Sequence, residues 1–237
     1  MKVSVCLATY NGSLYIRQQL DSIVRQLQLG DEVIVVDDAS VDNTVSIIEG
    51  YDDPRIRIIT NRANKGVIEA FESALSMATG DFIFLSDQDD VWADNKVSTI
   101  LDYFKMCNCD VIVSDLYIMD ASGKLTSQSF YQYRKVVGGS GILKNIYRNT
   151  YIGCAMAFRR RVLAHALPFP RQIPMHDVWI GIIGEIYGRS LFITDKLVYY
   201  RRHSSNASSK DRANFIQITK WRCHLCLSLL KRVLFNV

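Results

Sequence analysis

The stretch "DFIFLSDQDDVW", residues 81–92, decides how the rest of the chain is interpreted. Residues 82–85 form a continuous apolar run, which is typical of a strand buried on both faces. Three carboxylates follow directly, at Asp87, Asp89 and Asp90. Like charges this close repel and raise one another's pKa. We therefore expect a positive charge to compensate them, and a divalent cation is the first candidate.

The same succession of an apolar strand and a helix begins at the first residues. Strands are predicted at 3–9, 32–38, 55–61, 81–87 and 110–120, and helices with an apolar period near 3.6 residues at 13–27, 40–48, 67–80 and 97–104. Buried strands that alternate with helices form βαβ units and a parallel sheet. The predicted fold class is α/β, with a Rossmann-like, mostly parallel sheet flanked by helices.

After residue 120 the pattern is less regular. Residues 128–145 carry three glycines in four positions and are predicted to be a mobile loop. Strands are predicted at 151–160 and 190–203, with a helix at 176–188 between them.

We expect one domain over residues 1–206 and a tail over residues 207–237. Residues 1–120 of the domain are expected to bind one ligand, and residues 121–206 to present another. No low-complexity linker or internal repeat divides the domain.

Polar residues follow each of the first four predicted strands, where open α/β sheets bind their ligands. A carboxylate can accept from a nucleobase N–H, another can accept from ribose hydroxyls, and a metal-bound diphosphate needs hard oxygen ligands. The pair at 37–38 and the D-x-D at 87–89 supply all three. Alone, a D-x-D is often a solvated turn, but this one ends an apolar strand beside Trp92. The residues after the four strands are Thr9, Tyr10 and Asn11; Asp37 and Asp38; Asn61, Arg62, Asn64, Lys65 and Gly66; and Asp87, Asp89 and Asp90.

Other nucleotide- and cation-binding motifs are missing from the sequence. No G-x-G-x-x-G follows the first strand and no G-x-x-x-x-G-K-[ST] occurs. This disfavours a dinucleotide oxidoreductase and a P-loop NTPase. The remaining ligand positions of an EF-hand, with its bidentate Glu, are also missing.

The composition is ordinary for a soluble globular protein: 49% of the 237 residues are apolar, 22% are charged, and the net charge is +4. No apolar run approaches the roughly 18 residues that span a bilayer, and the N-terminus lacks a signal-peptide pattern. We expect a cytoplasmic chain whose six cysteines stay reduced and act as small buried hydrophobes, Cys223 and Cys226 included.

The tail combines apolar and basic residues at helical spacing. A basic amphipathic helix of this kind can lie in a membrane interface. Packing on the domain or on a second subunit is the alternative that the pattern leaves open. The residues are Ile218, Trp221, Leu225 and Leu229 on the apolar side, and Lys220, Arg222, Lys231 and Arg232 on the basic side.

Taken in order, "LATYNG", "VVDDAS", "NKG", "GDFIFLSDQDD", "MHDVW" and "YRRHSSN" resemble the motifs of the family 2 glycosyltransferases, which have the GT-A fold. The similarity covers about residues 1–206. It is greatest to rhamnosyltransferase-like and glucosyltransferase-like enzymes of bacterial surface polysaccharides. The resemblance implies inverting transfer of a sugar from a nucleotide diphosphate, UDP-hexose or dTDP-rhamnose, to an acceptor hydroxyl with Mn²⁺ or Mg²⁺.

The resemblance also implies partners and a location. The acceptor is expected to be an undecaprenyl-diphosphate-linked glycan, as in O-antigen or capsule synthesis, and no nucleic acid is expected to bind. The protein is then expected on the inner face of the cell membrane, as a peripheral protein.

On the donor side, the resemblance assigns roles to five residues. Thr9 and Tyr10 resemble the wall of the nucleobase pocket, and Asp38 resembles the carboxylate that reads the base N–H. Lys65 matches a position near base and ribose. Asp87 resembles the first Asp of the D-x-D, near ribose and metal.

The resemblance also supplies the metal ligands and the base. Asp89 resembles the direct metal ligand, and His203 resembles a late histidine that reaches the metal or diphosphate, with help expected from Arg201 or Arg202. Asp177 stands where the family has its catalytic base, and burial of its carboxyl group can raise the pKa to a useful value. Without the resemblance, Asp177 would be interpreted as a helix cap.

The chain departs from the common form at residue 176. Many relatives have Glu-Asp where this chain has His176-Asp177. The departure puts the role of His176 in question rather than that of Asp177.

Two other classes remain open. A nucleotidyltransferase normally has a glycine-rich basic loop after its first strand, which "ATYNGSLY" lacks. A non-catalytic nucleotide-sugar-binding module would keep Asp38 and the D-x-D but would not need Asp177.

Overall fold

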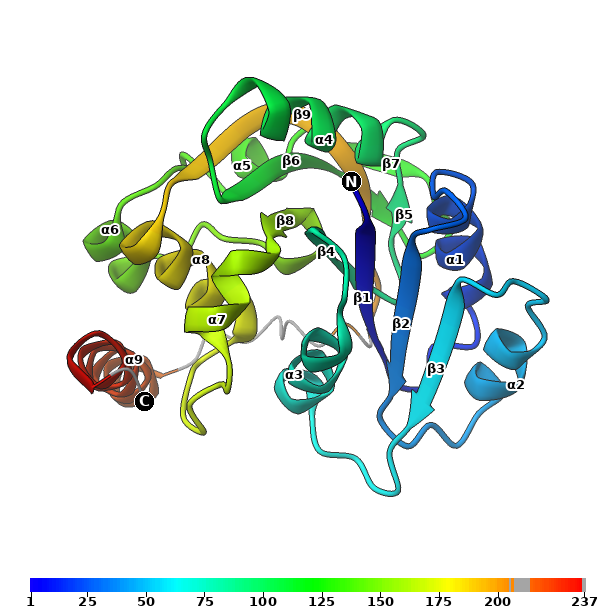
Figure 1. Ribbon diagram of the computed structural model, residues 1–237, viewed down its shortest axis with the longest axis horizontal. Coiled ribbons are helices and arrows are strands. Elements are labelled where there is room, and N and C mark those ends of the chain that lie inside the picture. The colour runs from blue at the N-terminus through cyan, green and yellow to red at the C-terminus, as the bar shows by residue number, and fades with distance from the viewer. Residues whose placement is uncertain (205, 207–213, 236–237) are drawn as a thin grey trace.

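The computed structural model describes residues 1–204, 206 and 214–235. Within them, nine strands form one sheet in the order β3-β2-β1-β4-β8-β6-β9-β5, with β7 paired to β6. The sheet curls, with α3, α7 and α8 inside the curve and α1, α2 and α4 outside it (Figure 1). The strands are β1 Val3–Thr9, β2 Glu32–Asp37, β3 Ile56–Thr60, β4 Phe82–Asp87, β5 Val91–Trp92, β6 Val111–Asp120, β7 Leu125–Ser127, β8 Met156–Arg159 and β9 Ser190–Arg202. The α-helices are α1 Ile16–Val24, α2 Thr44–Glu49, α3 Val67–Met77, α4 Lys96–Met106, α5 Phe130–Tyr133, α6 Ile142–Tyr147, α7 Leu163–Ala166, α8 His176–Tyr187 and α9 Phe215–Phe235.

The first four long strands form the parallel half of the sheet, which confirms the predicted α/β class. β1 pairs in parallel with β2 and with β4, and β2 pairs in parallel with β3. The register sets Thr9 opposite Asp37 and Ala8 opposite Asp87. The carboxyl ends of β1, β2 and β4 therefore meet at one edge, with their polar residues side by side.

The second half of the chain extends the sheet with mixed pairing. β8 is antiparallel to β4 and β6, β9 is parallel to β6, and β5 is antiparallel to β9. The two-residue β5 lies directly after the acidic loop, and its pairing sets Val91 opposite Tyr199. The end of β9 is thereby held beside the D-x-D.

Residues 128–145, predicted to be a mobile loop, contain α5 and most of α6. The Ser129 hydroxyl caps α5 by accepting from the Gln132 backbone N–H (3.2 Å). Buried Asn145 accepts from the Thr150 N–H (2.9 Å), and Glu185 of α8 accepts from the Gly141 N–H (2.9 Å). The segment therefore contains two short helices held by these bonds, so the prediction of a loop over all of it was wrong.

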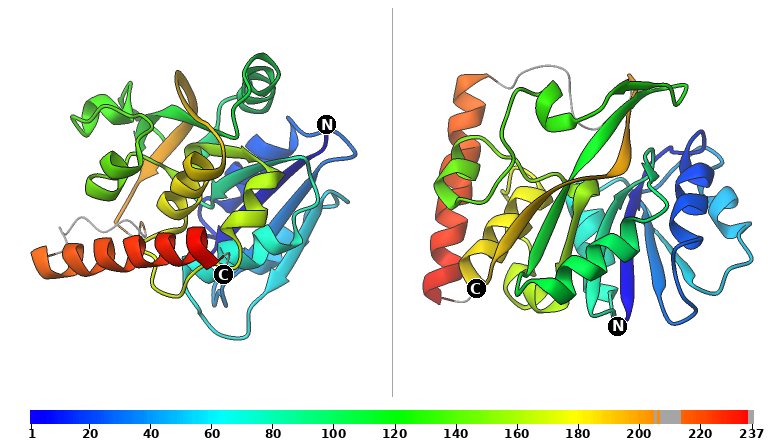
Figure 2. Two further views of the ribbon diagram at one scale, coloured as in Figure 1. Left: turned by 60° about the vertical axis from the view of Figure 1, so that its left-hand side comes forward. Right: turned by 90° about the horizontal axis from the view of Figure 1, so that it is seen from above.

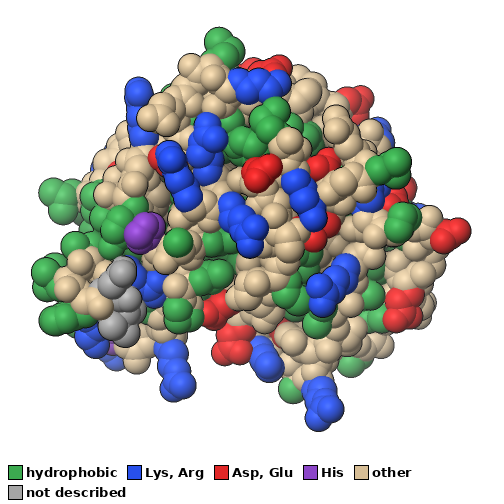
Figure 3. All heavy atoms as spheres, in the orientation of Figure 1, with side chains coloured by type: hydrophobic (Ala, Val, Ile, Leu, Met, Phe, Trp, Pro, Cys, Tyr) green, Lys and Arg blue, Asp and Glu red, His purple; other side chains and the backbone are tan. Residues whose placement is uncertain are grey.

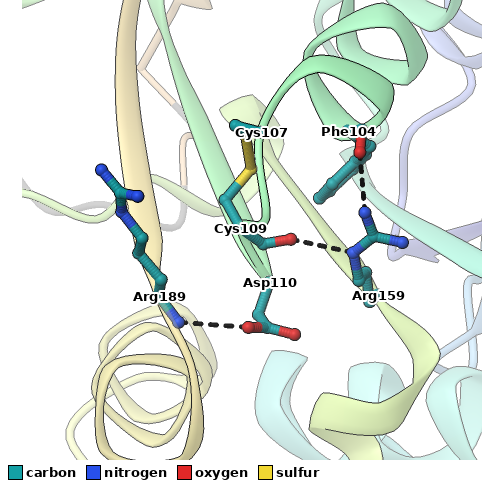
Figure 4. Close-up of a disulfide and its surroundings, with 6 residues drawn as sticks. All are labelled: Phe104, Cys107, Cys109, Asp110, Arg159 and Arg189. Atoms are coloured by element: carbon teal, nitrogen blue, oxygen red, sulfur yellow. Dashed lines mark hydrogen bonds between the residues drawn. A yellow bond between two sulfur atoms is a disulfide. The ribbon is translucent and has the colours of Figure 1, made fainter.

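Two of the six cysteines also differ from the prediction that all of them stay reduced. Cys107 and Cys109, just after α4, form a disulfide with their Cα atoms 5.4 Å apart (Figure 4). Their Cα separation suits a disulfide, so two residues between a helix end and a strand start can be bridged. The Arg159 guanidinium anchors the same turn through the Cys109 carbonyl (2.9 Å) and the Phe104 carbonyl (2.7 Å). Of the other cysteines, Cys6 and Cys154 are buried as expected, Cys226 is partly exposed, and Cys223 is exposed.

The tail forms the long helix α9, which runs along one side of the molecule (Figure 2). Leu225 and Leu229 are buried against the domain. The buried Arg232 guanidinium donates to the carbonyls of His165 (2.6 Å), Leu167 (3.0 Å) and Pro168 (2.5 Å). One face of the helix therefore packs on the domain, which is one of the alternatives left open by the sequence.

The opposite face of α9 is apolar and exposed. Hydrophobic side chains gather over α9 at the left edge of the molecule (Figure 3). Among them, Leu227, Leu230, Leu234 and Phe235 are 55–70% exposed. In the described part of the chain, no helix is both long and apolar enough to cross a membrane. Residues 207–213, 236 and 237 of the predicted tail lie outside the described residues.

Candidate functional site

A cleft of about 950 Å³ lies at the carboxyl ends of β1, β2 and β4. Residues 130–154, the start of α8 and one face of α9 form its opposite wall. Two of the predicted site residues lie beside it: Lys65, whose neighbours Asn64 and Gly66 line the cleft, and His203, which contacts Asp89. The predicted residues that line the cleft are Thr9, Tyr10, Asp38, Asp87, Asp89 and Asp177.

Gln88, the middle residue of the D-x-D, holds the end of β1. Its Oε1 accepts from the Thr9 hydroxyl (2.6 Å) and the Tyr10 N–H (2.8 Å), and its Nε2 donates to the Tyr10 carbonyl (3.0 Å). A Cβ at Gly12 would lie 2.2 Å from Gln88 Oε1, so a larger residue there would push the Gln88 amide out of this position. Tyr10 is left 45% exposed, with its ring available to a ligand.

Asp38 is buried and organises the loop after β3. Its carboxylate accepts from Asn61 Nδ2 (2.8 Å), the Lys65 N–H (2.9 Å) and the Gly66 N–H (2.7 Å). The loop is thereby fixed at the cleft wall, while the Lys65 side chain is exposed to solvent. Gly66 has a φ of 92°, a left-handed conformation that glycine adopts without strain.

The acidic cluster has its own buried counter-charge in Lys96. This lysine is fully buried at the start of α4, donates to the Cys154 carbonyl (2.7 Å), and lies 4.0 Å from the centre of the Trp92 ring. Burial and the neighbouring charges of Asp89 and Asp177 raise the pKa of Asp87 to about 7. Burial lowers the pKa of Lys96 to about 7, against the attraction of Asp90 and Asp87. Burial also raises the pKa of Asp90 well above its usual value.

Arg201, at the end of β9, is the second buried cation of the cluster. Its backbone N–H donates to Asp90 Oδ1 (2.9 Å), and its Nε donates to the Asp89 carbonyl (2.8 Å). A terminal nitrogen donates to Gln18 Oε1 (2.7 Å). Arg201 is 2% exposed, so it supports the D-x-D from behind, whereas Arg202 lines the cleft.

The two predicted metal ligands lie in direct contact. His203 Nε2 is 2.7 Å from Asp89 Oδ2, and Asn206 Nδ2 donates to the same oxygen (3.0 Å). Together, Asp89 and His203 offer one oxygen and one nitrogen donor to a metal ion. The partly exposed Asp87 lies close enough for the charge of Asp89 to raise its pKa. Such a donor set suits Mn²⁺ or Mg²⁺ better than a soft metal.

A second group of potential ligands lies deeper. One ligand atom each of Asp87, Asp90 and Cys154 falls within 4.8 Å of the others. Burial and the nearby carboxylates raise the pKa of the Cys154 thiol well above its usual value, so it stays protonated. A protonated thiol is a poor metal ligand. Asp89 and His203 are therefore the better candidates to hold a cation in the cleft.

Asp177 begins α8 and faces the cleft from the second half of the chain. Burial raises the pKa of its carboxyl group to about 6, against the hydrogen bonds that it accepts from nearby backbone N–H groups, including that of Val178. The charge of Asp177 also raises the pKa of Asp87, so the two carboxyl groups interact across the cleft. This arrangement can hold a proton acceptor opposite the D-x-D.

His176 points away from solvent and lines the floor of the cleft. Its ring stacks on Phe71 with centroids 4.0 Å apart, and a Cβ at Gly153 would lie 2.9 Å from its Nε2. Neither ring nitrogen has a hydrogen-bond partner among the described residues. Burial lowers the pKa of His176 to about 3, so the ring is neutral and packs as an aromatic residue.

Gln88, Lys96, Arg201 and Asn206 were not singled out in the sequence for the roles they have here. A signal existed for Lys96, which precedes Ile100 by four residues and so falls on the apolar face of its helix. No local signal marks Arg201, because its partners lie 111 and 112 residues earlier in the chain.

Comparison with known proteins gives the family of the chain. A model of the family described as Glycosyl transferase family 2 matches residues 4–167. The UDP-Glc:alpha-D-GlcNAc-diphosphoundecaprenol beta-1,3-glucosyltransferase WfaP of Escherichia coli is 30% identical over 213 residues, covering 87% of this chain and 80% of that protein. The dTDP-rhamnosyl transferase RfbG of Shigella flexneri is 28% identical over 214 residues, covering 84% and 72%.

Among solved structures, S. aureus TarS 1-349 in complex with UDP-GlcNAc superposes with a TM-score of 0.76. It is 23% identical, and the match covers 96% of this chain and 67% of that one, so it confirms the expected GT-A fold and nothing more. The chain spans about two thirds of the length of several curated relatives, from 66% to 72%. Because the family model covers well over half of the chain, this protein belongs to glycosyl transferase family 2.

Proposed function

We propose that this protein is an inverting, metal-dependent glycosyltransferase of bacterial surface-polysaccharide synthesis. It would transfer a sugar from a nucleoside diphosphate to a hydroxyl of a lipid-linked glycan. One observation carries the proposal: Asp177 faces the D-x-D across a single cleft, and its pKa is raised to about 6. A carboxylate with this pKa is ionised at neutral pH yet basic enough to accept a proton.

The donor in this proposal is a UDP-hexose or dTDP-rhamnose. The printed names of two relatives, a UDP-Glc-dependent glucosyltransferase and a dTDP-rhamnosyl transferase, support this choice. The loop fixed by Asp38 and the exposed ring of Tyr10 offer polar and stacking contacts for a base.

Asp177 accepts the proton of the acceptor hydroxyl while that oxygen attacks the anomeric carbon. The bond from the anomeric carbon to the diphosphate breaks, and its electron pair leaves with the diphosphate. A single displacement of this kind inverts the anomeric configuration. Bound at Asp89 and His203, Mn²⁺ or Mg²⁺ would supply a Lewis acid for the negative charge on the leaving group.

The acceptor is proposed to be an undecaprenyl-diphosphate-linked glycan, as the name of the E. coli relative suggests. Such an acceptor is anchored in the inner membrane. The exposed apolar face of α9, flanked by Lys220 and Lys231, supports a peripheral position on that membrane.

The proposal is tested by nucleotide binding and then by transfer. In a thermal-shift panel of UDP, dTDP, GDP and CDP with and without Mn²⁺, we expect one of the first two to raise the melting temperature, and more so with metal. A ligand at a hundred times its Kd stabilises by about 2.7 kcal/mol. Asp177→Asn should keep this binding and lose transfer.

Two results would contradict the proposal. If no nucleotide shows a metal-dependent shift, the cleft does not bind a nucleotide sugar. If nucleotide binding is present and Asp177→Asn transfers as well as the wild type, Asp177 is not the base.

A further inference from the structure

The cleft wall opposite the D-x-D carries arginines that the proposed reaction leaves without a role. Arg134 follows α5, Arg148 follows α6, and Arg222 lies on α9; all three line the cleft. No ion pair involves any of them within residues 1–204, 206 and 214–235. We call these three residues the arginine strip.

Contacts between the segments make the strip continuous. An Arg148 terminal nitrogen donates to the Arg134 carbonyl (3.4 Å), which sets the two residues side by side. The Arg222 guanidinium lies 4.8 Å from the centre of the Tyr147 ring and donates to the Tyr147 carbonyl. Because Tyr147 directly precedes Arg148, three segments distant in sequence bring their guanidinium groups to one wall.

Arginines on a cleft wall that form no ion pair within the described residues favour a ligand with several negative oxygens. Guanidinium groups bind phosphate oxygens through paired N–H donors, and an array of them suits a diphosphate. The donor residues, in contrast, come from residues 1–120 on the facing wall. The arginine strip and the proposed donor residues therefore lie on different walls of the cleft.

The surroundings of the strip are apolar as well as basic. Exposed apolar side chains of α6, Leu143 (82% exposed) and Tyr147 (72%), lie where α6 packs against α9. On α9 itself, Trp221 lines the cleft beside Arg222, and Leu230 on the outer side is 56% exposed. A ligand with an anionic head and a hydrocarbon chain matches both features.

We propose that the arginine strip binds the diphosphate of a polyprenyl-diphosphate-linked acceptor, with the polyprenyl chain leaving over the apolar side chains of α6 and α9. This inference rests on the proposed glycosyltransferase function and adds where the acceptor is held. The strip would position the acceptor's sugar so that its hydroxyl faces Asp177. It forms no bond with the reacting atoms.

The test compares a strip variant with a matched control. Arg134→Gln/Arg148→Gln removes two exposed charges without opening the core, and Arg57→Gln/Arg171→Gln removes two exposed arginines that do not line the cleft. Binding of geranylgeranyl diphosphate, geranylgeraniol and pyrophosphate is measured by calorimetry in EDTA, which prevents metal-mediated binding at the D-x-D. Binding of UDP and dTDP with Mn²⁺ is measured alongside.

We expect the strip variant to bind geranylgeranyl diphosphate at least tenfold more weakly than the wild type, with nucleotide affinity unchanged within twofold. The control variant should match the wild type for all probes. Pyrophosphate and geranylgeraniol should each bind the wild type more weakly than geranylgeranyl diphosphate, because each lacks one half of the ligand.

Four outcomes would overturn the inference. Loss of nucleotide affinity in the strip variant would assign the arginines to the donor, and an unchanged affinity for geranylgeranyl diphosphate would leave them without this role. Equal binding of pyrophosphate and geranylgeranyl diphosphate would exclude a contribution from the lipid. A wild-type protein that binds nucleotide but no polyprenyl diphosphate refutes this inference alone, whereas absence of nucleotide binding refutes the proposed function.

Discussion

The carboxyl group of Asp177 is in an environment that suits a proton acceptor. It is shielded from water and accepts hydrogen bonds from the backbone. Burial disfavours its charged form, while backbone N–H groups, such as that of Val178, stabilise the ionised carboxylate. The result is a pKa of about 6, above the ordinary value for Asp but below neutral pH. The residue is therefore mostly ionised under the conditions in which the proposed transfer would run.

A pH profile tests this assignment. Because Asp177 must be ionised to accept a proton, kcat/KM should fall about tenfold per pH unit below pH 6 and level off above it. Asp177→Asn should lower kcat by about 10²–10⁴-fold and leave no acid limb in the residual activity. An acid limb that persists unchanged in this variant would assign the titration to another group.

The raised pKa of Asp87 leads to a prediction about the stability of the folded chain. Its pKa rises to about 7 in the folded chain. Ionisation of the buried carboxyl group therefore costs stability that grows as the pH rises from the ordinary Asp pKa of about 4 to about 7, and is complete above pH 7. Without metal, at pH 8, Asp87→Asn should raise the melting temperature by about 2–4 °C, the effect of about 1 kcal/mol in a chain of this size. At pH 5 the wild-type carboxyl group is largely protonated and the gain should shrink.

Thermal unfolding in EDTA at the two pH values measures this difference. A gain that is equal at pH 5 and pH 8 would mean that the effect does not come from the charge. Ser86→Ala, at the neighbouring buried position that has no titratable group, serves as the control for pH.

At the scale of the elements, the long apolar strands and the polar residues that follow them could be predicted from the sequence. Very short strands, and helices that depend on contacts with distant residues, could not. β1, β2, β3 and β4 agree with the prediction to within one residue at each end. β1, β2 and β4 are buried on both faces and appear in the sequence as nearly unbroken apolar runs, whereas β3 is an edge strand without a fully buried residue. β5 has two residues, too few to show a period. α6 depends on hydrogen bonds from buried Asn145, which no local pattern reveals.

The same distinction holds for the candidate site. Its carboxylates follow strands, so sheet topology alone predicts that they converge. The compensating cations come from the start of α4 and the end of β9, and their contacts exist only after the sheet has formed. We expected a metal ion to offset the acidic cluster, and the fold also supplies Lys96 and Arg201.

The buried guanidinium of Arg232 and the buried Leu225 and Leu229 help to hold α9 on the domain, so its attachment can be tested by mutation. Arg232→Met should leave carbonyls of residues 165, 167 and 168 without their donor and destabilise the chain by about 1–3 kcal/mol. Lys231→Met removes a neighbouring exposed cation and should have little effect. Urea unfolding gives the free-energy change, and limited proteolysis within residues 214–235 reports detachment of the helix.

If the two variants unfold alike and resist protease equally, the three carbonyl bonds do not hold α9. A loss of stability in Arg232→Met without faster cleavage of the helix would place the defect in α7 instead.

At the scale of the whole molecule, the two faces of α9 lie in different environments, one against the domain and one in contact with solvent. One face lines the cleft through Ile218, Trp221 and Arg222, and the other carries exposed apolar side chains. Leu230→Glu/Leu234→Glu should reduce binding to vesicles of anionic phospholipid at least tenfold, because two exposed leucines would become charged. Leu29→Glu, at a leucine that is 91% exposed in the turn before β2, is the matched control and should bind as the wild type does.

Vesicle flotation at two salt concentrations measures this binding. Binding that is equally strong in the α9 variant would show that another surface contacts the lipid. Binding that disappears in both variants would mean that any added negative charge prevents it.

Because Arg201 lies late in the chain, the acidic loop after β4 can be completed only late in protein synthesis. Asp90 receives its backbone donor from a residue 111 positions later. A ribosome therefore releases the D-x-D long before the strand that completes it, and the acidic loop takes its final shape only when β9 pairs with β5. A nascent chain that ends at residue 167, where the family match stops, contains every donor-side carboxylate but neither Arg201 nor His203. If the cleft holds a sugar donor, as proposed, its acidic loop is completed in one of the last steps of synthesis, when most of the sheet is already in place.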